Sequence, residues 1–368
     1  MAGVLVHEWI AQAGGSENVL QEMSVAFPDA EVVCLWNEST GRFESRRVRQ
    51  SWIARTPLRR HKALALPLMP PTWRLLRDHG YDWALISSHA FAHHARFRGA
   101  PVGFRRMVYV HTPARYVWTR AFDARGDNPF ARVASQALRP LDRHRAQEGA
   151  EFAANSEFVR ERIRNVWGVD ARVIYPPVQV ERIQSLPDWR DQLDGVDAAI
   201  LEKLPEGYLL GASRFIPYKR LEQVIEVGAA TGRPVVLAGR GPSRSVLEEA
   251  AARASVPVHF VSGPSEALLY ALYQQASAFV FPAVEDFGIM PVEAMAAGAA
   301  VLAQVEGGAA ESVVEGATGS LIDFRSPSEM RTGLDRALAT DRADRLQRAK
   351  DFGAERFRGE IQSWVGER

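Results

Sequence analysis

The chain has 368 residues, of which 46% are hydrophobic, and its 45 basic and 44 acidic side chains leave a formal net charge of +1. That length exceeds what one hydrophobic core usually supports, and the apolar fraction excludes a mainly disordered chain. The single Cys34 excludes an internal disulfide framework and a cysteine-based zinc cluster. The N-terminal MAGVLVHEWIAQ lacks the basic flank of a signal peptide, and no apolar run is long enough for a membrane span. We therefore expect a soluble, two-domain protein of a reducing compartment.

Short apolar runs alternate with helical stretches along the chain. Each run is continuously apolar and ends in Gly, Ser, His or Pro, as is typical of parallel strands buried on both faces. Amphipathic segments such as EALLYALYQQA lie between the runs. The predicted strands are residues 4–6, 32–35, 83–87, 107–110, 208–212, 235–238, 258–261, 278–281 and 300–303. The alternation predicts an α/β fold in which two such series each form a parallel sheet covered by helices.

The boundary between the two series falls near the middle of the chain. After VIYPPVQ the chain is polar and contains Pro187 and Pro205 before a fresh strand begins. We expect a first domain over residues 1–178 and a second over residues 179–351. The last segment, residues 352–368, predicts an amphipathic helix.

Charge is distributed unevenly between the halves. Residues 1–175 hold 25 Lys and Arg against 17 Asp and Glu, a net charge of +8, so the remainder, with 20 against 27, carries −7. Between Arg42 and Arg77 ten basic residues face only Glu44. This excess indicates either contact with an anionic surface or ligand, or a solvated arginine-rich face.

The strongest functional signal is FPAVEDFGIMPVEAMAAG, residues 281–298. Its pattern predicts a strand, a tight turn at Gly288, and a helix that Pro291 opens. Free backbone amides and the positive end of that helix would form a seat for pyrophosphate. Glu285 and Glu293 would face this seat, where carboxylates can accept hydrogen bonds from sugar or ribose hydroxyls. A glutamate that stabilises the positive N-terminal end of a helix could explain Glu293 alone, but not the whole segment.

This Glu285-x7-Glu293 segment resembles the signature of the retaining glycosyltransferases of family 4, also called group 1. The segments ANSEFVRERI, VIYPPV, SRFIPYKRLEQVI, AGRGP and GGAAESVVEGATGSLID resemble further parts of the same family, so the likeness covers nearly the whole chain. The resemblance implies the GT-B fold, in which two Rossmann-like domains face each other across a cleft. It also implies that the C-terminal helix crosses back to the first domain.

In the family, the segment that SRFIPYKRLEQVI resembles binds the donor pyrophosphate, which implies that role for Arg214 and Lys219. Both residues follow a predicted strand, where open α/β sheets place ligands. Two cations can neutralise a diphosphate leaving group in place of a divalent metal, so no metal and no cofactor are expected. The donor-binding set that we expect comprises Gly14, Gly15, Gly239, Arg240, Phe287, Gly288, Ile289, Met290 and Glu293.

The N-terminal half offers candidate residues at strand ends. QAGGSENVL resembles the family's Gly-rich loop, and HTPARYVW places His111 directly after a strand. ISSHAF places Ser87, Ser88 and His89 at the end of another strand. His111 resembles the histidine that lies beside the reacting sugar, so we prefer it to His89. The HTPARYVW run also resembles mannosyltransferases that take GDP-mannose.

The resemblance implies an enzyme that transfers a hexose, with mannose favoured, from a nucleotide sugar with retention at the anomeric carbon. Its catalytic residues would be His111, Glu285, Arg214 and Lys219, with Glu293 on the nucleotide ribose. The family is usually described by front-face attack, for which stabilisation of the leaving group matters most.

Other classes of protein fit less well. An NAD-type oxidoreductase lacks support because QAGGSE stands where GxGxxG would follow the first strand. A non-catalytic relative would have lost Glu285, Glu293, Arg214 or Lys219, and all four are present. A UDP-sugar donor with a small soluble acceptor, an epimerase and a phosphorylase-like enzyme remain alternatives.

The acceptor is expected to be a glycan or a lipid-linked sugar, and no nucleic-acid partner is expected. Basic residues alternate with large apolar ones between Arg42 and Arg77, which favours peripheral attachment to the anionic face of the inner membrane by a cytoplasmic protein. The competing interpretation is a buried apolar segment beside solvated arginines. Residues expected on the acceptor or membrane side are Arg46, Arg47, Arg49, Trp52 and Ser88.

Overall fold

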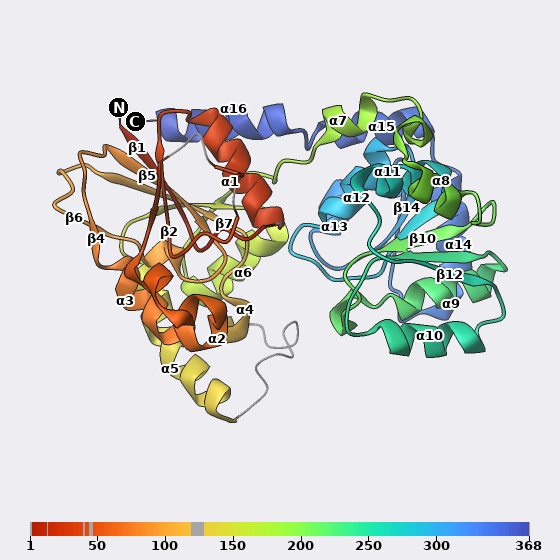
Figure 1. The fold of residues 1–368 in the computed structure, drawn as a ribbon, viewed down its shortest axis with the longest axis horizontal. Helices are drawn as coiled ribbons and strands as arrows, with labels where there is room; N and C mark the ends of the chain where they lie inside the picture. The colour runs from red at the N-terminus through yellow and green to blue at the C-terminus, as the bar shows by residue number, and fades with distance from the viewer. Residues whose placement is uncertain (1, 13, 40, 44–46, 119–128, 368) are drawn as a thin grey trace. The chain divides into compact units, whose positions relative to one another are not determined.

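The structure is a computed structural model that describes residues 2–12, 14–39, 41–43, 47–118 and 129–367. The chain divides into two compact units (Figure 1). Met1–Pro177 and Glu355–Arg368 form the first unit, and Val178–Ala354 forms the second. Each unit contains one parallel sheet with helices on both faces, so the expected α/β class is confirmed.

The first unit is built on a seven-stranded sheet in the order β3-β2-β1-β5-β7-β8-β9, and all its pairings are parallel. Its strands are β1 (Gly3–His7), β2 (Glu31–Cys34), β3 (Val48–Gln50), β5 (Trp83–Ser88), β7 (Arg105–Val110), β8 (Glu151–Ala154) and β9 (Arg172–Val173). A two-stranded ladder joins β4 (Leu76–Arg77) to β6 (Phe97–Arg98). From β1 the chain builds outward to β2 and β3, and then returns to place β5 on the other side of β1. The point between β1 and β5 is thus a topological switch, where open α/β sheets bind ligands.

Alternate side chains of these strands enter two separate cores, as a sheet buried on both faces requires. Val4 and Val6 pack on one face, whereas Leu5 packs on the other. The helices of this unit are α1 (Gly15–Ala26), α2 (Lys62–Ala65), α3 (Met69–Trp73), α4 (Arg115–Trp118), α5 (Pro129–Ala146), α6 (Glu157–Trp167) and α16 (Ala354–Gly366), with short 3-10 turns η1 (Trp52–Arg55), η2 (Pro57–Arg60), η3 (Leu66–Leu68) and η4 (Ala92–His94).

The final helix, α16, belongs to the first unit although it follows the whole of the second unit in sequence. Its buried side chains Phe357, Ile361 and Trp364 join the core that also contains Leu5. The Arg105 guanidinium donates to the Val365 carbonyl at 2.8 Å. Helix α16 thereby covers one face of the first sheet.

The second unit contains a six-stranded parallel sheet in the order β12-β11-β10-β13-β14-β15. The strands are β10 (Leu209–Ala212), β11 (Val235–Ala238), β12 (Val258–Val261), β13 (Ala278–Phe281), β14 (Ala300–Gln304) and β15 (Ser320–Ile322). Its helices are α7 (Val180–Gln184), α8 (Gly195–Leu201), α9 (Glu222–Thr231), α10 (Arg244–Arg253), α11 (Glu266–Gln275), α12 (Ile289–Ala296), α13 (Ala309–Ser312), α14 (Pro327–Leu338) and α15 (Arg342–Lys350), with turns η7 (Trp189–Gln192) and η8 (Pro217–Lys219). Here the direction of strand addition reverses between β10 and β13, which makes that point the second topological switch.

Each of the nine strands expected from apolar runs overlaps a strand of these two sheets. The strands β3, β8, β9 and β15 were not among them. The reason is visible in β3, VRQ, and β9, RV, which are short, carry arginine and lie at or near sheet edges. Such strands need no continuous apolar run because one of their sides has no neighbouring strand.

Candidate active site

At the switch point of the second unit, the loops that follow β10 and β13 are joined by an ion pair. Lys219, in turn η8, contacts the Glu285 carboxylate with its Nζ atom. Both side chains are largely buried, at 12% and 15% exposure. The two residues that the sequence singled out are therefore brought together although 66 positions separate them.

Arg214 and Arg240 provide further positive charge near the ends of β10 and β11. Both side chains are exposed. Arg214 approaches the Tyr218 hydroxyl at 3.5 Å, and Arg240 donates to the Ser262 carbonyl at 3.2 Å. These weak contacts leave both guanidinium groups able to turn toward an anion at this edge of the sheet.

Two glycines let the loops after β10 and β11 pack backbone against backbone. A Cβ atom at Gly239 would lie 1.8 Å from the Ser213 carbonyl oxygen, and one at Gly241 would lie 2.3 Å from that of Phe215. Between them the Arg240 carbonyl accepts a hydrogen bond from the Phe215 amide at 2.8 Å. No side chain fits at either glycine, which explains the AGRGP pattern physically.

The loop after β13 and the start of α12 hold four more residues of the expected donor set, Phe287, Gly288, Ile289 and Met290. Gly288 takes a φ of 84° and ends the loop, and α12 begins at Ile289 with Pro291 in its first turn. Phe287 is buried, whereas Met290 is partly exposed. Because the first four amides of a helix have no partner within the helix, the start of α12 can accept an anion or a hydroxyl.

The pair Gly307–Gly308, after β14, was not assigned to the site from sequence. The Gly308 amide donates to the Glu285 carbonyl at 2.8 Å, and a Cβ atom at Gly308 would lie 2.2 Å from the Asp286 carbonyl oxygen. These glycines therefore hold the loop that carries Glu285. The GG in GGAAESVVEGATGSLID was the available signal.

Glu293 lies in α12 and is partly buried. Its carboxylate accepts a hydrogen bond of 3.4 Å from the Tyr273 hydroxyl. Burial raises the pKa of Glu293 to about 7, with the Glu266 charge acting in the same direction and the Tyr273 hydrogen bond opposing it. A carboxyl that titrates near neutrality can change its hydrogen-bonding capacity within the working pH range.

At the switch point of the first unit, three polar side chains form a chain across adjacent strands. The Ser87 hydroxyl lies 3.0 Å from His7 Nδ1 and 2.8 Å from His111 Nε2. Burial, together with the charges of His111 and Arg42, lowers the pKa of His7 to about 3. His7 is therefore neutral at physiological pH, and Ser87 fixes one nitrogen of His111. Sequence reasoning placed Ser87 at a strand end without giving it a role, and it missed His7, which also stands at a strand end.

Ser88 and His89 take different positions from His111. Ser88 is buried and its hydroxyl donates to Glu8, which places this group in the interior rather than at an acceptor surface. The His89 ring packs edge-on against Trp9, with centroids 4.6 Å apart, and burial lowers the pKa of His89 well below its usual value.

Gly14 and Gly15 lead into α1 and are exposed. Directly beside them the Glu17 carboxylate accepts hydrogen bonds from the Ala11 amide at 3.1 Å and from the Ser16 hydroxyl at 2.9 Å. The buried Glu17 carboxylate lies near the positive N-terminal end of α1, where a negative charge is stabilising, and its hydrogen bonds hold the Gly-rich loop. Glu17 was not expected from the sequence.

The residues expected on the membrane or acceptor side are only partly available. Arg46 lies outside the described residues. Arg47 and Arg49 both pair with Glu31, at 3.0 and 3.5 Å. Trp52 is 46% exposed, although its indole donates to Thr72. No helix in the described part of the chain has the length and apolar content to cross a bilayer.

Two family models match the chain. Residues 197–356 match the model of glycosyl transferases group 1, and residues 13–182 match that of glycosyltransferase family 4. The chain belongs to the family 4 glycosyltransferases. The first model covers the residues of the second switch point, and the other covers Ser87 and His111 of the first.

Curated relatives of this glycosyltransferase include mannosyltransferases. It is 34% identical over 36% of its length to the alpha-1,3/1,6-mannosyltransferase alg-2 of Neurospora crassa, and the match spans 28% of that protein. It is 29% identical over 52% of its length to a GDP-mannose-dependent phosphatidylinositol monomannoside mannosyltransferase of Mycobacterium tuberculosis, spanning 54% of that protein. The matches thus span about half or less of these relatives.

Solved structures show the fold. The glycosyltransferase superposes on Anabaena HepE in complex with UDP-glucose with a TM-score of 0.72, at 18% identity and 99% coverage of both chains. It superposes on WaaG, a glycosyltransferase involved in lipopolysaccharide biosynthesis, with a TM-score of 0.61, at 16% identity and 100% coverage of both. The expected GT-B fold is confirmed.

Proposed function

We propose that this glycosyltransferase moves a hexose, with mannose favoured, from a nucleotide diphosphate sugar to a hydroxyl of a glycan or glycolipid acceptor, with retention at the anomeric carbon. The observation that supports this most directly is the contact of Lys219 with Glu285 at the switch point of the second unit. That contact brings a cation suited to a diphosphate beside a carboxylate suited to sugar hydroxyls.

The roles of the residues follow from their chemistry. Lys219 and Arg214 neutralise the charge that develops on the departing diphosphate, and amides at the start of α12 assist them. Glu285 accepts hydrogen bonds from the transferred sugar, and Glu293 accepts them from the ribose. His111, held by Ser87, contacts the sugar through its ring.

In the proposed reaction the C1–O bond to the diphosphate breaks while the acceptor oxygen bonds to C1 on the same face. The acceptor proton passes to the departing phosphate oxygen, so no external base is needed. Since two side-chain cations neutralise the leaving group, the reaction requires no divalent metal in the donor site.

GDP-mannose is proposed as the donor for two reasons. The HTPARYVW segment resembles mannosyltransferases that take GDP-mannose, and two relatives of the chain are mannosyltransferases, one of them GDP-mannose-dependent. A UDP-sugar with a small soluble acceptor is the second candidate. The proposed location is the cytoplasm, with peripheral contact to the inner face of the membrane.

A donor screen tests the proposal. The protein is mixed with GDP-, UDP-, ADP- and dTDP-sugars in a thermal-shift assay, and stabilising donors are then incubated with and without glycan and lipid-linked acceptors in the presence of EDTA. We expect stabilisation by GDP-mannose and an α-linked product only when an acceptor is added. An epimerised nucleotide sugar without an acceptor, or transfer that manganese or magnesium must restore, would contradict the proposal.

A further inference from the structure

A buried cluster of two histidines and one aspartate lies in the first unit, separate in sequence from every donor-site residue. His93 and His94 belong to η4, and Asp142 belongs to α5. Their side chains are 0%, 1% and 0% exposed. His93 Nε2 lies 3.2 Å from Asp142 Oδ1, and His94 Nε2 lies 3.0 Å from the same oxygen. Two ring nitrogens therefore converge on one carboxylate oxygen in the interior.

The other oxygen of Asp142 is fully engaged. Its Oδ2 atom accepts hydrogen bonds of 2.7 Å from the indole groups of Trp118, in α4, and Trp167, in α6. Two rigid donors hold the carboxylate in one orientation, with Oδ1 directed at the histidines. Such outer contacts orient the carboxylate ligands of metal sites.

A chain of hydrogen bonds determines which nitrogen of His93 carries its proton. The Glu8 Oε1 atom accepts hydrogen bonds from the amides of Ala90 and Ala92, and the Ser88 hydroxyl donates to the same oxygen at 3.4 Å. That hydroxyl has only one proton, so while it donates to Glu8 its oxygen accepts from the His93 amide and from His93 Nδ1, both 3.3 Å away. His93 Nε2 is then left as an unprotonated lone pair.

That lone pair faces a negatively charged oxygen. His93 Nε2 has no hydrogen-bond partner among the described residues, because its approach to Asp142 Oδ1 lacks hydrogen-bond geometry. A lone pair and a carboxylate 3.2 Å apart repel unless a cation lies between them. The histidine of a metal site characteristically shows this arrangement, with one nitrogen hydrogen-bonded and the other bare.

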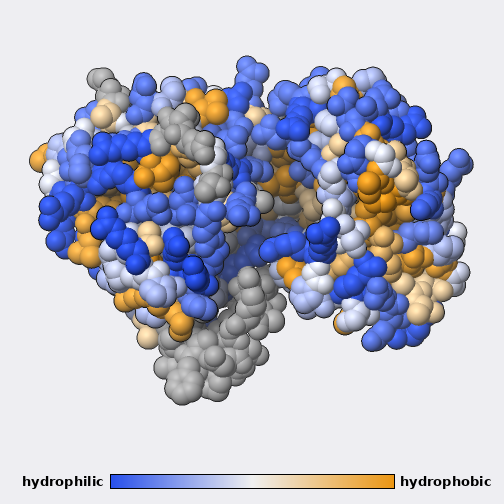
Figure 2. Space-filling view, in the orientation of Figure 1, coloured by the Kyte–Doolittle hydropathy of each residue, from blue (hydrophilic) through white to orange (hydrophobic). Residues whose placement is uncertain are grey.

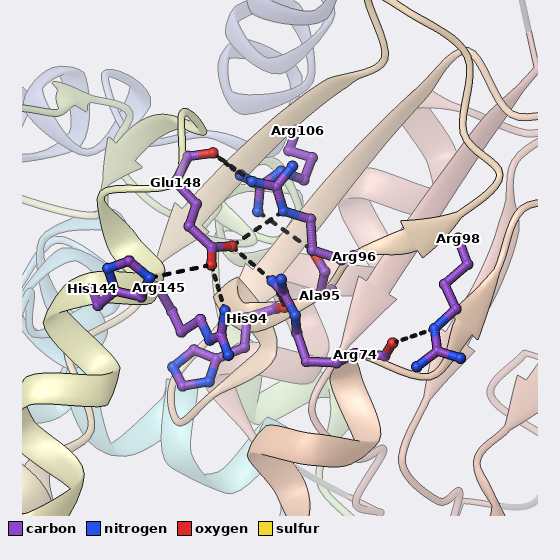
Figure 3. A network of polar contacts seen from close by, with 9 residues as sticks. All are labelled: Arg74, His94, Ala95, Arg96, Arg98, Arg106, His144, Arg145 and Glu148. Carbon is purple, nitrogen blue, oxygen red and sulfur yellow. Dashed lines mark hydrogen bonds and ion pairs between the residues drawn. The ribbon is translucent and has the colours of Figure 1, made fainter.

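Neighbouring arginines do not supply the missing positive charge. Arg74, Arg96 and Arg145 pair instead with Glu148, at distances down to 2.5 Å (Figure 3). Within the described part of the chain, Asp142 has no ion pair with Lys or Arg. Hydrogen bonds from His94, Trp118 and Trp167 reach this buried carboxylate but leave its negative charge unneutralised, so a cation in the cluster would be stabilising.

We propose that His93 Nε2, His94 Nε2 and Asp142 Oδ1 bind one divalent transition-metal ion, with zinc the best match. These ligand atoms all lie within 4.8 Å of one another. Zinc binds nitrogen at about 2.0–2.1 Å and carboxylate oxygen at about 2.0–2.2 Å, and three protein ligands leave a fourth tetrahedral position for water. The ion ties η4 to α5 and so stabilises the first unit. It takes no part in the sugar transfer.

The first test is the metal content of the protein, purified through a tag without histidine from zinc-supplemented cells and measured by inductively coupled plasma mass spectrometry. We expect about one zinc per chain. The variants His94→Gln and Asp142→Asn should lose most of it, whereas His144→Gln should retain it because this histidine lies on the same helix but is 71% exposed. An equal zinc content in the wild type and in all three variants would overturn the proposal.

A second measurement uses the wild-type protein, so it does not depend on whether the variants fold. X-ray absorption at the zinc edge of the wild-type protein should show two imidazole ligands. If the wild type contains no zinc and gains none on refolding with zinc chloride, the proposal is wrong. If the nitrogen NMR spectrum of the folded protein shows a doubly protonated His93, the proposal is also wrong, because a proton then occupies the nitrogen that should bind the metal. None of these readouts depends on transfer activity, so failure here leaves the proposed function standing. Brief EDTA treatment of the native protein should leave the buried ion in place.

Discussion

Lys219 and Glu285 show how much a single contact depends on its surroundings. The same two residues on an open surface would contribute little, since exposed ion pairs are worth about 0–1 kcal/mol. Here both side chains are largely buried and lie where two strands of the second sheet diverge. A donor diphosphate that reaches Lys219 would therefore meet a cation already held in place.

The first prediction concerns this cation and its neighbour. Lys219→Met and Arg214→Ala should each lower kcat by about 100- to 1000-fold, since each removes positive charge from the leaving group. Arg244→Ala, in α10 of the same unit, is the control because its guanidinium pairs with Glu248. The measurement is steady-state transfer together with the thermal midpoint of each variant. Near-normal turnover in both site variants would mean that the diphosphate binds elsewhere.

The second prediction uses the titration of Glu293. Burial raises its pKa to about 7 in the folded protein, above the unfolded value of 4.5. Between these two pKa values the folded protein holds a proton on Glu293 that the unfolded chain has lost. The free energy of unfolding should therefore fall as pH rises from about 4.5 to about 7. Ribose hydroxyls donate to the carboxylate, so donor affinity should rise with pH through 7.

Calorimetric titration of GDP-mannose between pH 6 and pH 8 checks this. Glu293→Gln should remove most of the pH dependence of binding. The comparison with the variant is needed because burial also raises the pKa of Glu8 to about 7. An unchanged pH profile in Glu293→Gln would assign the titration to another group.

At the scale of elements, the sequence predicted most of the central strands and their alternation with helical segments. Strands such as β1 and β13 are buried on both faces, so their sequences must be continuously apolar. Edge strands escape this requirement, and β3 and β9 were missed for that reason. The hydrogen-bonded chain His7–Ser87–His111 could not be foreseen either, because it depends on the register that sets His7 opposite Ser87.

The third prediction concerns α16. Trp364→Ala should lower the free energy of unfolding by about 3–5 kcal/mol, since it leaves a large cavity against the first sheet. The neighbouring exposed Ser363→Ala serves as the control and should change stability by less than about 0.5 kcal/mol. Urea denaturation followed by circular dichroism gives both values. Equal midpoints for the two variants would show that α16 contributes little to the first core.

At the scale of the whole molecule, the two halves of the chain differ in net charge. Arg55, Arg59, Arg60 and Lys62 are exposed on the first unit, close in sequence to the exposed Trp52 and Leu64. Figure 2 shows hydrophilic and hydrophobic patches side by side on this unit. Such a surface suits an anionic membrane, to which each near-surface cation adds about 1 kcal/mol.

The fourth prediction is that the protein floats with liposomes that contain anionic lipid at low salt and is released at high salt. The double variant Arg59→Glu, Arg60→Glu should abolish flotation. Arg253→Glu, exposed on α10 of the second unit, should leave it unchanged. Absence of binding by the wild type at low salt would favour a soluble acceptor. The Arg47 and Arg49 side chains are weaker choices for this test because both pair with Glu31.

In sequence, the second unit is inserted into the first, because the chain leaves the first unit after Pro177 and returns to it at Glu355. Both chain ends belong to the first unit, whereas the ends of the second lie next to each other through a parallel bridge between Val178 and Gly353. The Val178 amide also donates to the Phe352 carbonyl at 2.9 Å. The second unit can therefore be excised at neighbouring points, and the nucleotide binding proposed for it can be measured by itself. The same junction is a place to graft the corresponding unit of another family member without moving either terminus.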